Sequence, residues 1–213
     1  MSTSRKASKG EVIANVATHA VGSLLAIAGL VLLVVFSSCH GTARHIVSCS
    51  IYGATLWLMF LMSTVYHSLP EGAAKKTLRV FDHCAIYLVI AGTYTPFTLA
   101  VLPPEWGWSI FGVVWGLAIL GIVQKIFFIN RWPLMSTVLY ILMGWIIVIA
   151  AKPMFDRLPM GGIIFLVAGG VAYTLGALFY VFDDRPYLHA VWHVFVLVGA
   201  ICQYLSIFFF VIP

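Results

Sequence analysis

The length of its apolar runs is the feature that most constrains this chain of 213 residues. A helix needs about 20 predominantly apolar residues to cross roughly 30 Å of hydrocarbon. Seven such runs follow one another, at residues 14–36, 46–69, 80–102, 108–129, 134–151, 161–182 and 188–213. Each is continuously apolar, whereas the strands of a membrane barrel alternate over about 10 residues. The sequence therefore predicts an all-α integral membrane protein, a seven-transmembrane helix bundle.

The composition excludes the water-soluble classes of protein. Hydrophobic residues make up 62% of the chain and charged residues only 9%, against roughly one quarter charged in a soluble domain. So few charges cannot coat a water-facing surface, which excludes a soluble enzyme, a nucleic-acid-binding protein and a disordered regulator. The breaks between the runs are short. We therefore expect a single domain over residues 1–213, with a short polar cytoplasmic segment at residues 1–10.

The distribution of Lys and Arg predicts the orientation of the chain, because cytoplasmic loops are enriched in both. On the side of the amino terminus lie nine of them, namely Arg5, Lys6, Lys9, Lys75, Lys76, Arg79, Lys125, Arg131 and Arg185. The opposite side holds Arg44, Lys152 and Arg157. The amino terminus is therefore expected in the cytoplasm and the carboxyl terminus outside.

The four cysteines contain no C-x-x-C pair. Cys39 and Cys49 flank the first outer loop, so a disulfide between them is one interpretation. Two free thiols that behave as small apolar residues are the other.

Polar residues within the spans gather at one end of the predicted bundle. Odd-numbered spans begin at the cytoplasmic side and even-numbered spans end there, so four groups share one layer. These are Glu11, Asn15 and His19 on one face of the first span, Ser63 with His67 at the end of the second, Asp82 with His83 opening the third, and His189 with His193 opening the seventh. His40 and His45 are assigned to the outer loop. Ionisable groups inside a membrane are costly and are functional candidates by default.

Each of these residues also has a structural interpretation. A single His at a helix end is commonly an interfacial hydrogen-bonding group, and Ser63 could bond to its own helix. Asp82 could be favoured by the dipole at the start of its helix, and Glu11 could be an exposed charge. The i, i+4 pair of His189 and His193 is more specific, because that spacing aims two imidazoles at one point. Its convergence with His67 and Asp82 favours a metal site.

The side-chain types indicate which metal and which chemistry. Two or three imidazoles near a carboxylate suit zinc, and three protein ligands leave an open position for water. Such a metal acidifies its water and polarises a carbonyl, while a nearby Asp takes a proton and a Ser donates to an oxyanion. The sequence thus allows hydrolysis of a lipid amide or ester within the bilayer. Spacing leaves open whether His83 or Cys84 is also a ligand, since successive helical residues point about 100° apart.

Five motifs together resemble the haemolysin III family, the bacterial branch of the progestin and adipoQ receptor superfamily. They are Glu11-x-x-x-Asn15 leading into Thr18-His19, Ser63-Thr-Val-Tyr-His67, Phe81-Asp-His-Cys-Ala-Ile-Tyr87, Ala91-Gly-Thr-Tyr-Thr-Pro96 and His189-Ala-Val-Trp-His193. The match is collinear from about residue 11 to residue 210, and the set of motifs is specific where any one of them is not.

The resemblance implies a zinc ion (Zn²⁺) bound by His67, His189 and His193. It also implies Asp82 beside the water of the metal and Ser63 one turn before the first ligand, which gives Asp82 and Ser63 as catalytic candidates. The family implies a multi-pass protein of the bacterial inner (plasma) membrane, with a membrane lipid as substrate or ligand and no nucleic acid as partner.

Three functions follow from this resemblance. The superfamily includes adiponectin receptors with ceramidase-type hydrolysis, so the first is a zinc-dependent hydrolase of a lipid amide that acts in membrane lipid homeostasis. The second is a non-enzymatic sensor of membrane state with structural zinc. The third is a cytolysin, as the family name suggests, although seven spans describe a resident membrane protein rather than a secreted pore former.

Pro96 lies within the third span, where a proline removes a backbone hydrogen bond and bends the helix. We expect a kink there that frees a backbone carbonyl near the middle of the membrane, with a role in packing.

Overall fold

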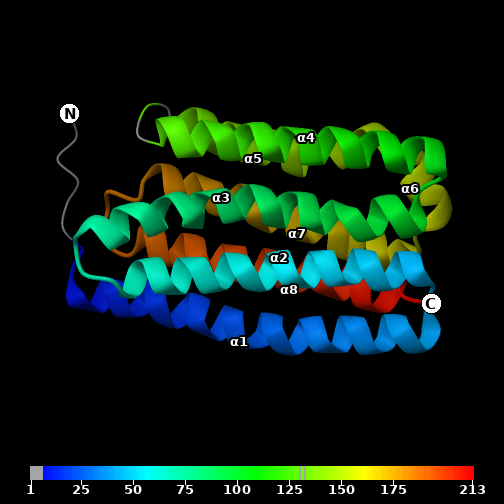
Figure 1. Cartoon of the computed structure of the whole chain (residues 1–213), viewed down its shortest axis with the longest axis horizontal. Coiled ribbons are helices and arrows are strands. Elements are labelled where there is room, and N and C mark those ends of the chain that lie inside the picture. The colour runs from blue at the N-terminus through cyan, green and yellow to red at the C-terminus, as the bar shows by residue number, and fades with distance from the viewer. Residues whose placement is uncertain (1–6, 130, 132) are drawn as a thin grey trace.

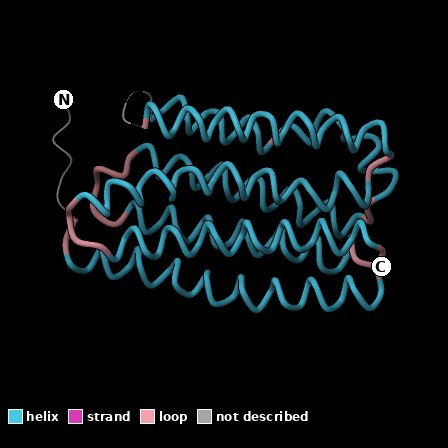
Figure 2. Tube along the Cα trace, viewed as in Figure 1, coloured by secondary structure: helices cyan, strands magenta, loops and turns pink. Residues whose placement is uncertain are grey.

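The computed structural model describes residues 7–129, 131 and 133–213, and all regular elements in these ranges are helical. In chain order they are α1 (Lys9–His40), α2 (Ala43–Ser68), α3 (Ala73–Pro96), the π-helical turn η1 (Phe97–Val101), α4 (Pro104–Phe128), α5 (Pro133–Gly144), the 3-10 turn η2 (Ile146–Ala150), α6 (Ala151–Arg157), α7 (Met160–Val181) and α8 (Leu188–Phe210). The helices run along the long axis of the molecule, and the loops lie at its two ends (Figures 1 and 2).

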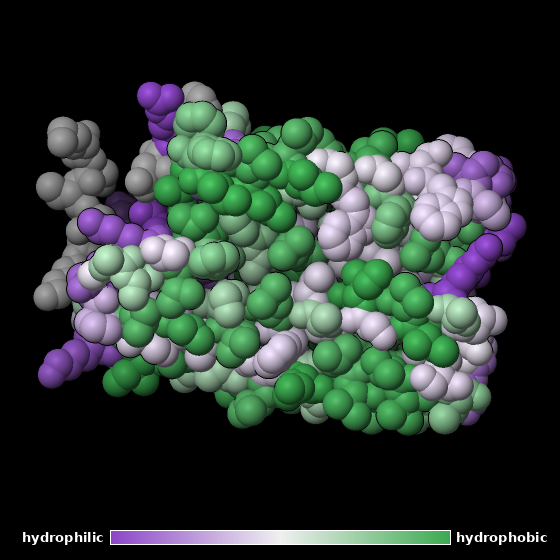
Figure 3. Space-filling model, viewed as in Figure 1, coloured by the Kyte–Doolittle hydropathy of each residue, from purple (hydrophilic) through white to green (hydrophobic). Residues whose placement is uncertain are grey.

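Within the described ranges, seven helical segments are long and apolar enough to cross a membrane, as the sequence predicts. The fifth consists of α5, η2 and α6 together and covers Leu134–Arg157, while η1 extends the third to Val101. On the face drawn in Figure 3, apolar side chains form a broad band between two polar ends. α1 begins at one end of the bundle and α8 finishes at the other (Figure 1). The prediction of a seven-helix membrane bundle is confirmed.

α3 lies at the centre of the bundle. In its most apolar stretch 61% of the residues are buried, against at most 44% in any other span. α1 runs along one edge, packed on α2 and α8, and α4 with α5 runs along the opposite edge (Figure 1). The end at which α1, α3 and α8 begin carries most of the Lys and Arg residues, and is called the basic end below. By the positive-inside rule this end faces the cytoplasm.

The first connection is shorter than the sequence predicts. α1 continues to His40 and α2 begins at Ala43, so only Gly41 and Thr42 join them. The imidazole of His45 accepts a hydrogen bond from the backbone N–H of Thr42 at 3.1 Å, which caps α2. The assignment of His40 and His45 to an outer loop is therefore wrong, because both helices extend beyond the apolar part of their sequence.

All four cysteines are free. Cys49 is buried within α2 and Cys39 is exposed at the end of α1. The structure therefore supports two free thiols rather than a disulfide between Cys39 and Cys49.

The helical path changes pitch after Pro96, the last residue of α3. The backbone N–H of Leu102 donates to the carbonyl oxygen of Phe97 at 2.9 Å, which closes one wide π-helical turn. Wide turns of this kind are a common response of a helix to a break in its hydrogen-bond ladder. The interruption expected at Pro96 thus takes the form of η1.

The fifth span is broken at Trp145, and the hydroxyl of Tyr94 on α3 satisfies the break. It lies 2.8 Å from the carbonyl oxygen of Met143 and 2.9 Å from that of Gly144, and it accepts a hydrogen bond from the backbone N–H of Ile147 at 3.0 Å. Irregular backbone at membrane depth is tolerated only where the protein itself supplies such partners. One side chain of the central helix therefore holds the fifth span in its broken form.

Replacement of Tyr94 by Phe removes these hydrogen bonds and leaves backbone groups unpaired in an apolar setting. We expect Tyr94→Phe to lower the free energy of unfolding by about 1–3 kcal/mol, measured by reversible denaturant unfolding in mixed micelles. Tyr204→Phe is the matched control, because the Tyr204 hydroxyl contacts a carbonyl of the unbroken helix α1, that of Gly29, at 3.3 Å. Equal losses in the two variants would contradict the role given to Tyr94.

Candidate metal centre

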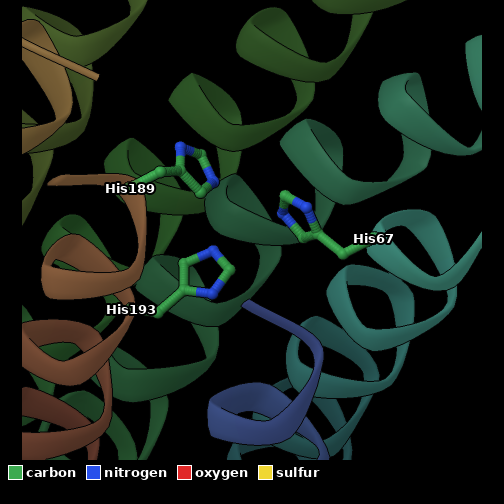
Figure 4. A group of neighbouring side chains, drawn as sticks. All are labelled: His67, His189 and His193. Atoms are coloured by element: carbon green, nitrogen blue, oxygen red, sulfur yellow. The ribbon is translucent and has the colours of Figure 1, made fainter. Parts of the chain in front are cut away.

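Three imidazoles from two helices converge near the basic end (Figure 4). His67 lies in the last turn of α2, and His189 and His193 lie one turn apart at the start of α8. One ring nitrogen from each lies within 4.8 Å of the corresponding atoms of the other two. The ring centroids are 4.7–5.0 Å apart. The i, i+4 spacing on α8 therefore does aim both rings at the same space, and the end of α2 completes the group.

Neighbouring acceptors orient two of the three rings. Nδ1 of His193 lies 3.2 Å from the carbonyl oxygen of Asn15 on α1, and Nδ1 of His189 lies 3.4 Å from a carboxylate oxygen of Asp183. A ring that donates from Nδ1 keeps the lone pair of Nε2 for another partner. Metal-binding histidines usually show this arrangement, with the second nitrogen held by a carbonyl or a carboxylate.

The third ring has an unused nitrogen. Nε2 of His67 is buried and has no hydrogen-bond partner among the described residues. A buried polar atom without a partner is costly and calls for an explanation such as an ion. Three neutral imidazoles are a donor set that zinc prefers, and calcium or magnesium would instead take oxygen ligands. The side chains at this position therefore fit a zinc ion.

Ser63 and Asp82 lie beside the three histidines. Ser63 is buried one turn before His67 on α2, and its side chain lies beside that of Asp82 on α3. The Asp82 side chain is 14% exposed, so it keeps limited access to water. Both residues line the same cavity as His189 and His193. The five predicted site residues thus come together from α2, α3 and α8.

The structure also shows where His83 and Cys84, the two residues after Asp82, direct their side chains. Nδ1 of His83 lies 2.9 Å from the Arg79 carbonyl oxygen, and its Nε2 lies 3.5 Å from the hydroxyl of Tyr180 on α7. Cys84 directs its thiol at the carbonyl oxygen of Ile122 on α4, 4.0 Å away. Neither side chain belongs to the three-histidine group.

His19 forms a second layer behind His193. The two rings are stacked, with centroids 3.6 Å apart and planes 17° apart, and His19 makes a T-shaped contact with Phe60. Neither nitrogen of His19 has a hydrogen-bond partner among the described residues. It supports one side of His193 and is not part of the three-ligand group.

Glu11 is a structural tie rather than an exposed charge. Its side chain is buried, with a residue exposure of 5%, and it accepts hydrogen bonds from the backbone N–H groups of Tyr187 at 3.0 Å and Ser8 at 2.8 Å. Tyr187 has a φ of 62°, a left-handed conformation that costs a non-glycine residue roughly 1–2 kcal/mol. Glu11 therefore connects the start of α1 to the strained residue two positions before His189.

A cavity of about 520 Å³ extends from the centre into the bundle. At the basic end it is lined by His189, Asp82 and Ser63, and further in it reaches Phe97 and Gln203. Its volume lies within the range of about 300–1,000 Å³ typical of small-molecule sites. A polar entrance that leads to an interior lined by aromatic and aliphatic side chains suits an amphiphilic ligand.

Several contributors to this site were not predicted. Asp183 lies in the loop before α8 and has no periodic relation to His189, and Tyr180 is an ordinary apolar position on α7. Lys125 is also a cavity residue, although the sequence predicts for it only a place among the cytoplasmic charges. Its position inside the predicted span 108–129 was the available signal, because ionisable groups within a membrane are functional candidates. Its burial depends on the neighbouring helices.

Comparison with known proteins places these residues in a family. A family model described as "Haemolysin-III related" matches residues 9–204. "Hemolysin-3" of Bacillus cereus is 43% identical over 203 residues, 95% of this chain and 93% of the relative. "Hemolysin-3 homolog" of Bacillus subtilis (strain 168) is 44% identical over 200 residues, 94% of each chain. "Monocyte to macrophage differentiation factor" of Homo sapiens is 30% identical over 209 residues, 92% of this chain and 83% of the relative. No solved structure gives a significant match.

The tie made by Glu11 generates a prediction about stability. Glu11→Ala leaves two backbone N–H groups without their carboxylate, so we expect the free energy of unfolding to fall by about 1.5–3 kcal/mol. Reversible unfolding in micelles measures the change. Glu105→Ala is the matched control, because Glu105 is an exposed acid in the first turn of α4 at the opposite end. A Glu11→Ala variant as stable as this control would show that the tie does not stabilise the fold.

Proposed function

Because this chain belongs to the haemolysin-III-related family of multi-pass membrane proteins, we propose that it is a zinc-dependent hydrolase of a lipid amide. The observation that carries the proposal is the convergence of His67, His189 and His193, with one buried nitrogen unused, beside a cavity of about 520 Å³ that His189 and His193 line. The ligand set leaves room for a reactant, as catalytic zinc sites do.

The zinc would be held by His67 from α2 and by His189 and His193 from α8. When bound, it supplies a Lewis acid with an open position, which polarises a carbonyl and favours ionisation of water. Asp183 and the Asn15 carbonyl keep two of the rings in the orientation that presents the second nitrogen. These neighbours make the site rigid before any ligand arrives.

Asp82 and Ser63 supply the proton and hydrogen-bond chemistry. Asp82 accepts a proton from the attacking water and passes it to the departing amine, so that an amide and a water become a carboxylic acid and an amine. The hydroxyl of Ser63 lies beside Asp82 and can donate a hydrogen bond to its carboxylate. Ser63 lies one helical turn before His67. When a substrate binds, the Ser63 hydroxyl can donate a hydrogen bond to the oxygen of the scissile carbonyl, which stabilises the negative charge that develops on this oxygen.

A second function has its own supporting observation. The three histidines join α2 to α8, and His193 also packs on α1 through Asn15 and His19. A metal there would fasten three helices and serve a non-enzymatic sensor of membrane state. We place the hydrolase first because a purely structural metal does not require Asp82 and Ser63 at the same cavity wall.

The proposed setting is the inner membrane of a bacterium, with the basic end in the cytoplasm. Hydrolysis would then occur at the depth of the cytoplasmic leaflet, since the three histidines lie near that end. Membrane lipid homeostasis is the process such an activity would serve. The names of the two Bacillus relatives refer to haemolysis, and a cytolysin ranks third because seven spans describe a resident protein.

Metal analysis of detergent-purified protein tests the zinc site. We expect about one zinc per wild-type chain and little in His193→Ala, because loss of one of three ligands strongly weakens binding. His40→Ala is the control, since His40 ends α1 at the opposite end of the bundle. Equal zinc content in all three proteins would remove the proposed site.

Turnover of a ceramide-like amide by purified protein tests the hydrolase. We expect Asp82→Asn to keep its zinc and to lose roughly 100-fold or more in rate, because the amide cannot take the proton. Fatty acid release measured by mass spectrometry gives the rate. Zinc-replete wild-type protein that releases no fatty acid from any lipid amide would favour the sensor, and full activity of Asp82→Asn would refute the role of Asp82.

A further inference from the structure

A buried lysine lines the cavity and is not used by the proposed hydrolysis. Lys125 lies in the last turn of α4, inside a membrane-spanning helix, and only 2% of its surface is exposed. Among the described residues it has neither a carboxylate partner nor a side-chain hydrogen bond. An ionisable group in such a position is costly and is a functional candidate.

Two structural explanations account poorly for this burial. A lysine at the end of a span usually extends its ammonium to the aqueous interface, but Lys125 is enclosed. Its position near the last carbonyls of α4 is favourable to the helix dipole. The attraction to the dipole does not provide hydrogen-bond acceptors for the three N–H groups of the ammonium, and none is found among the described residues. A ligand in the cavity would supply them.

The charges around Lys125 favour an anion. Lys76 and Arg79, in the first turns of α3, line the same cavity, and Arg79 is an electrostatic neighbour of Lys125. We call these three cations the basic rim. The acids of the cavity wall face other groups: Glu71 lies 2.9 Å from Lys75, Asp183 lies 3.4 Å from His189, and Asp82 lies 3.7 Å from His83.

We propose that the basic rim, through Lys125, binds the anionic head of a lipid whose chain occupies the cavity. The head is an oxyanion, a phosphate or a carboxylate, because both accept charge-assisted hydrogen bonds from lysine and arginine. The inference rests on the proposed function only in taking the occupant to be a lipid. If the chain is a hydrolase, it should cleave amide lipids with a negatively charged head faster than neutral ones.

The depth of the cavity supports a lipid over a free anion. It extends from the basic rim past Ile86 and Ile90 to Phe97 on the central helix. An inorganic anion needs no such space. Transfer of an acyl chain from water into an apolar interior of this size is favourable, because it removes apolar surface from water. The rim and the interior together match the two parts of an amphiphile.

Native mass spectrometry of zinc-loaded, detergent-purified protein tests the proposal. The probes are phosphatidylglycerol, phosphatidylcholine with the same acyl chains, and inorganic phosphate. We expect phosphatidylglycerol to bind at least about tenfold more tightly than phosphatidylcholine, and Lys125→Met to remove most of this preference. Lys125→Arg keeps the charge and should keep the preference. Arg131→Gln is the matched control, since Arg131 is an exposed cation at the same end, outside the cavity wall.

The stability of the variant separates a binding residue from a structural one. Replacing a buried, unpaired charge by an apolar side chain is often neutral or stabilising. We therefore expect the melting temperature of Lys125→Met to be equal to or above that of the wild type. Lys125→Gln repeats the test with a polar side chain if the Met variant does not fold, and loss of the preference in this variant supports the proposal equally.

Three outcomes would overturn the proposal. They are equal binding of the two phospholipids, an unchanged preference in folded Lys125→Met or Lys125→Gln, and displacement of phosphatidylglycerol by inorganic phosphate at comparable concentration, which would indicate an anion site without lipid. Zinc content is measured in every sample. Wild-type protein without zinc would contradict the proposed hydrolase. If His193→Ala also binds phosphatidylglycerol as the wild type does, the proposed lipid site remains supported.

Discussion

The structure depends on one constraint of the hydrocarbon interior: every backbone polar group must find a partner within the protein. Regular helices meet it along most of the chain. Where the fifth span breaks at Trp145, a hydroxyl from the central helix supplies the missing partners. The position of α3 among the other helices is therefore both a packing feature and a hydrogen-bonding one. Its central place also brings Asp82 to the wall of the cavity.

The same constraint makes the buried polar side chains informative. An unpaired polar group in an apolar interior is costly, so one without a protein partner is a candidate for contact with a ligand or with water. Glu11 and Asp183 are paired with the backbone of Tyr187 and with His189. Among the described residues, Nε2 of His67 is buried without a hydrogen-bond partner, and Lys125, which lines the cavity, has no carboxylate partner. A metal ion bound to His67 and the anionic head of a lipid bound to Lys125 would supply these two side chains with partners.

Much of the fold and part of the candidate site could be predicted from sequence. The seven spans follow from the length of their apolar runs, and the layer of His67, His189 and His193 follows from their places near span ends. The bounds of the helices were less certain, because residues such as His40 and His45 continue a helix beyond its apolar segment. The role of Glu11 was open, since nothing local to it indicates the backbone of Tyr187, 176 positions away.

By itself, the sequence determined the class of the protein, the number and order of its spans and the end at which its polar residues gather. These properties depend on the local transfer of side chains between water and lipid, which a linear sequence contains in full. Only the tertiary structure decided which way each helix is rotated, and so which neighbours of Asp82 face the centre and which turn away. It also decided that Lys125 is enclosed. Rotation and burial are set by contacts between helices far apart in the chain, and no single segment carries that information.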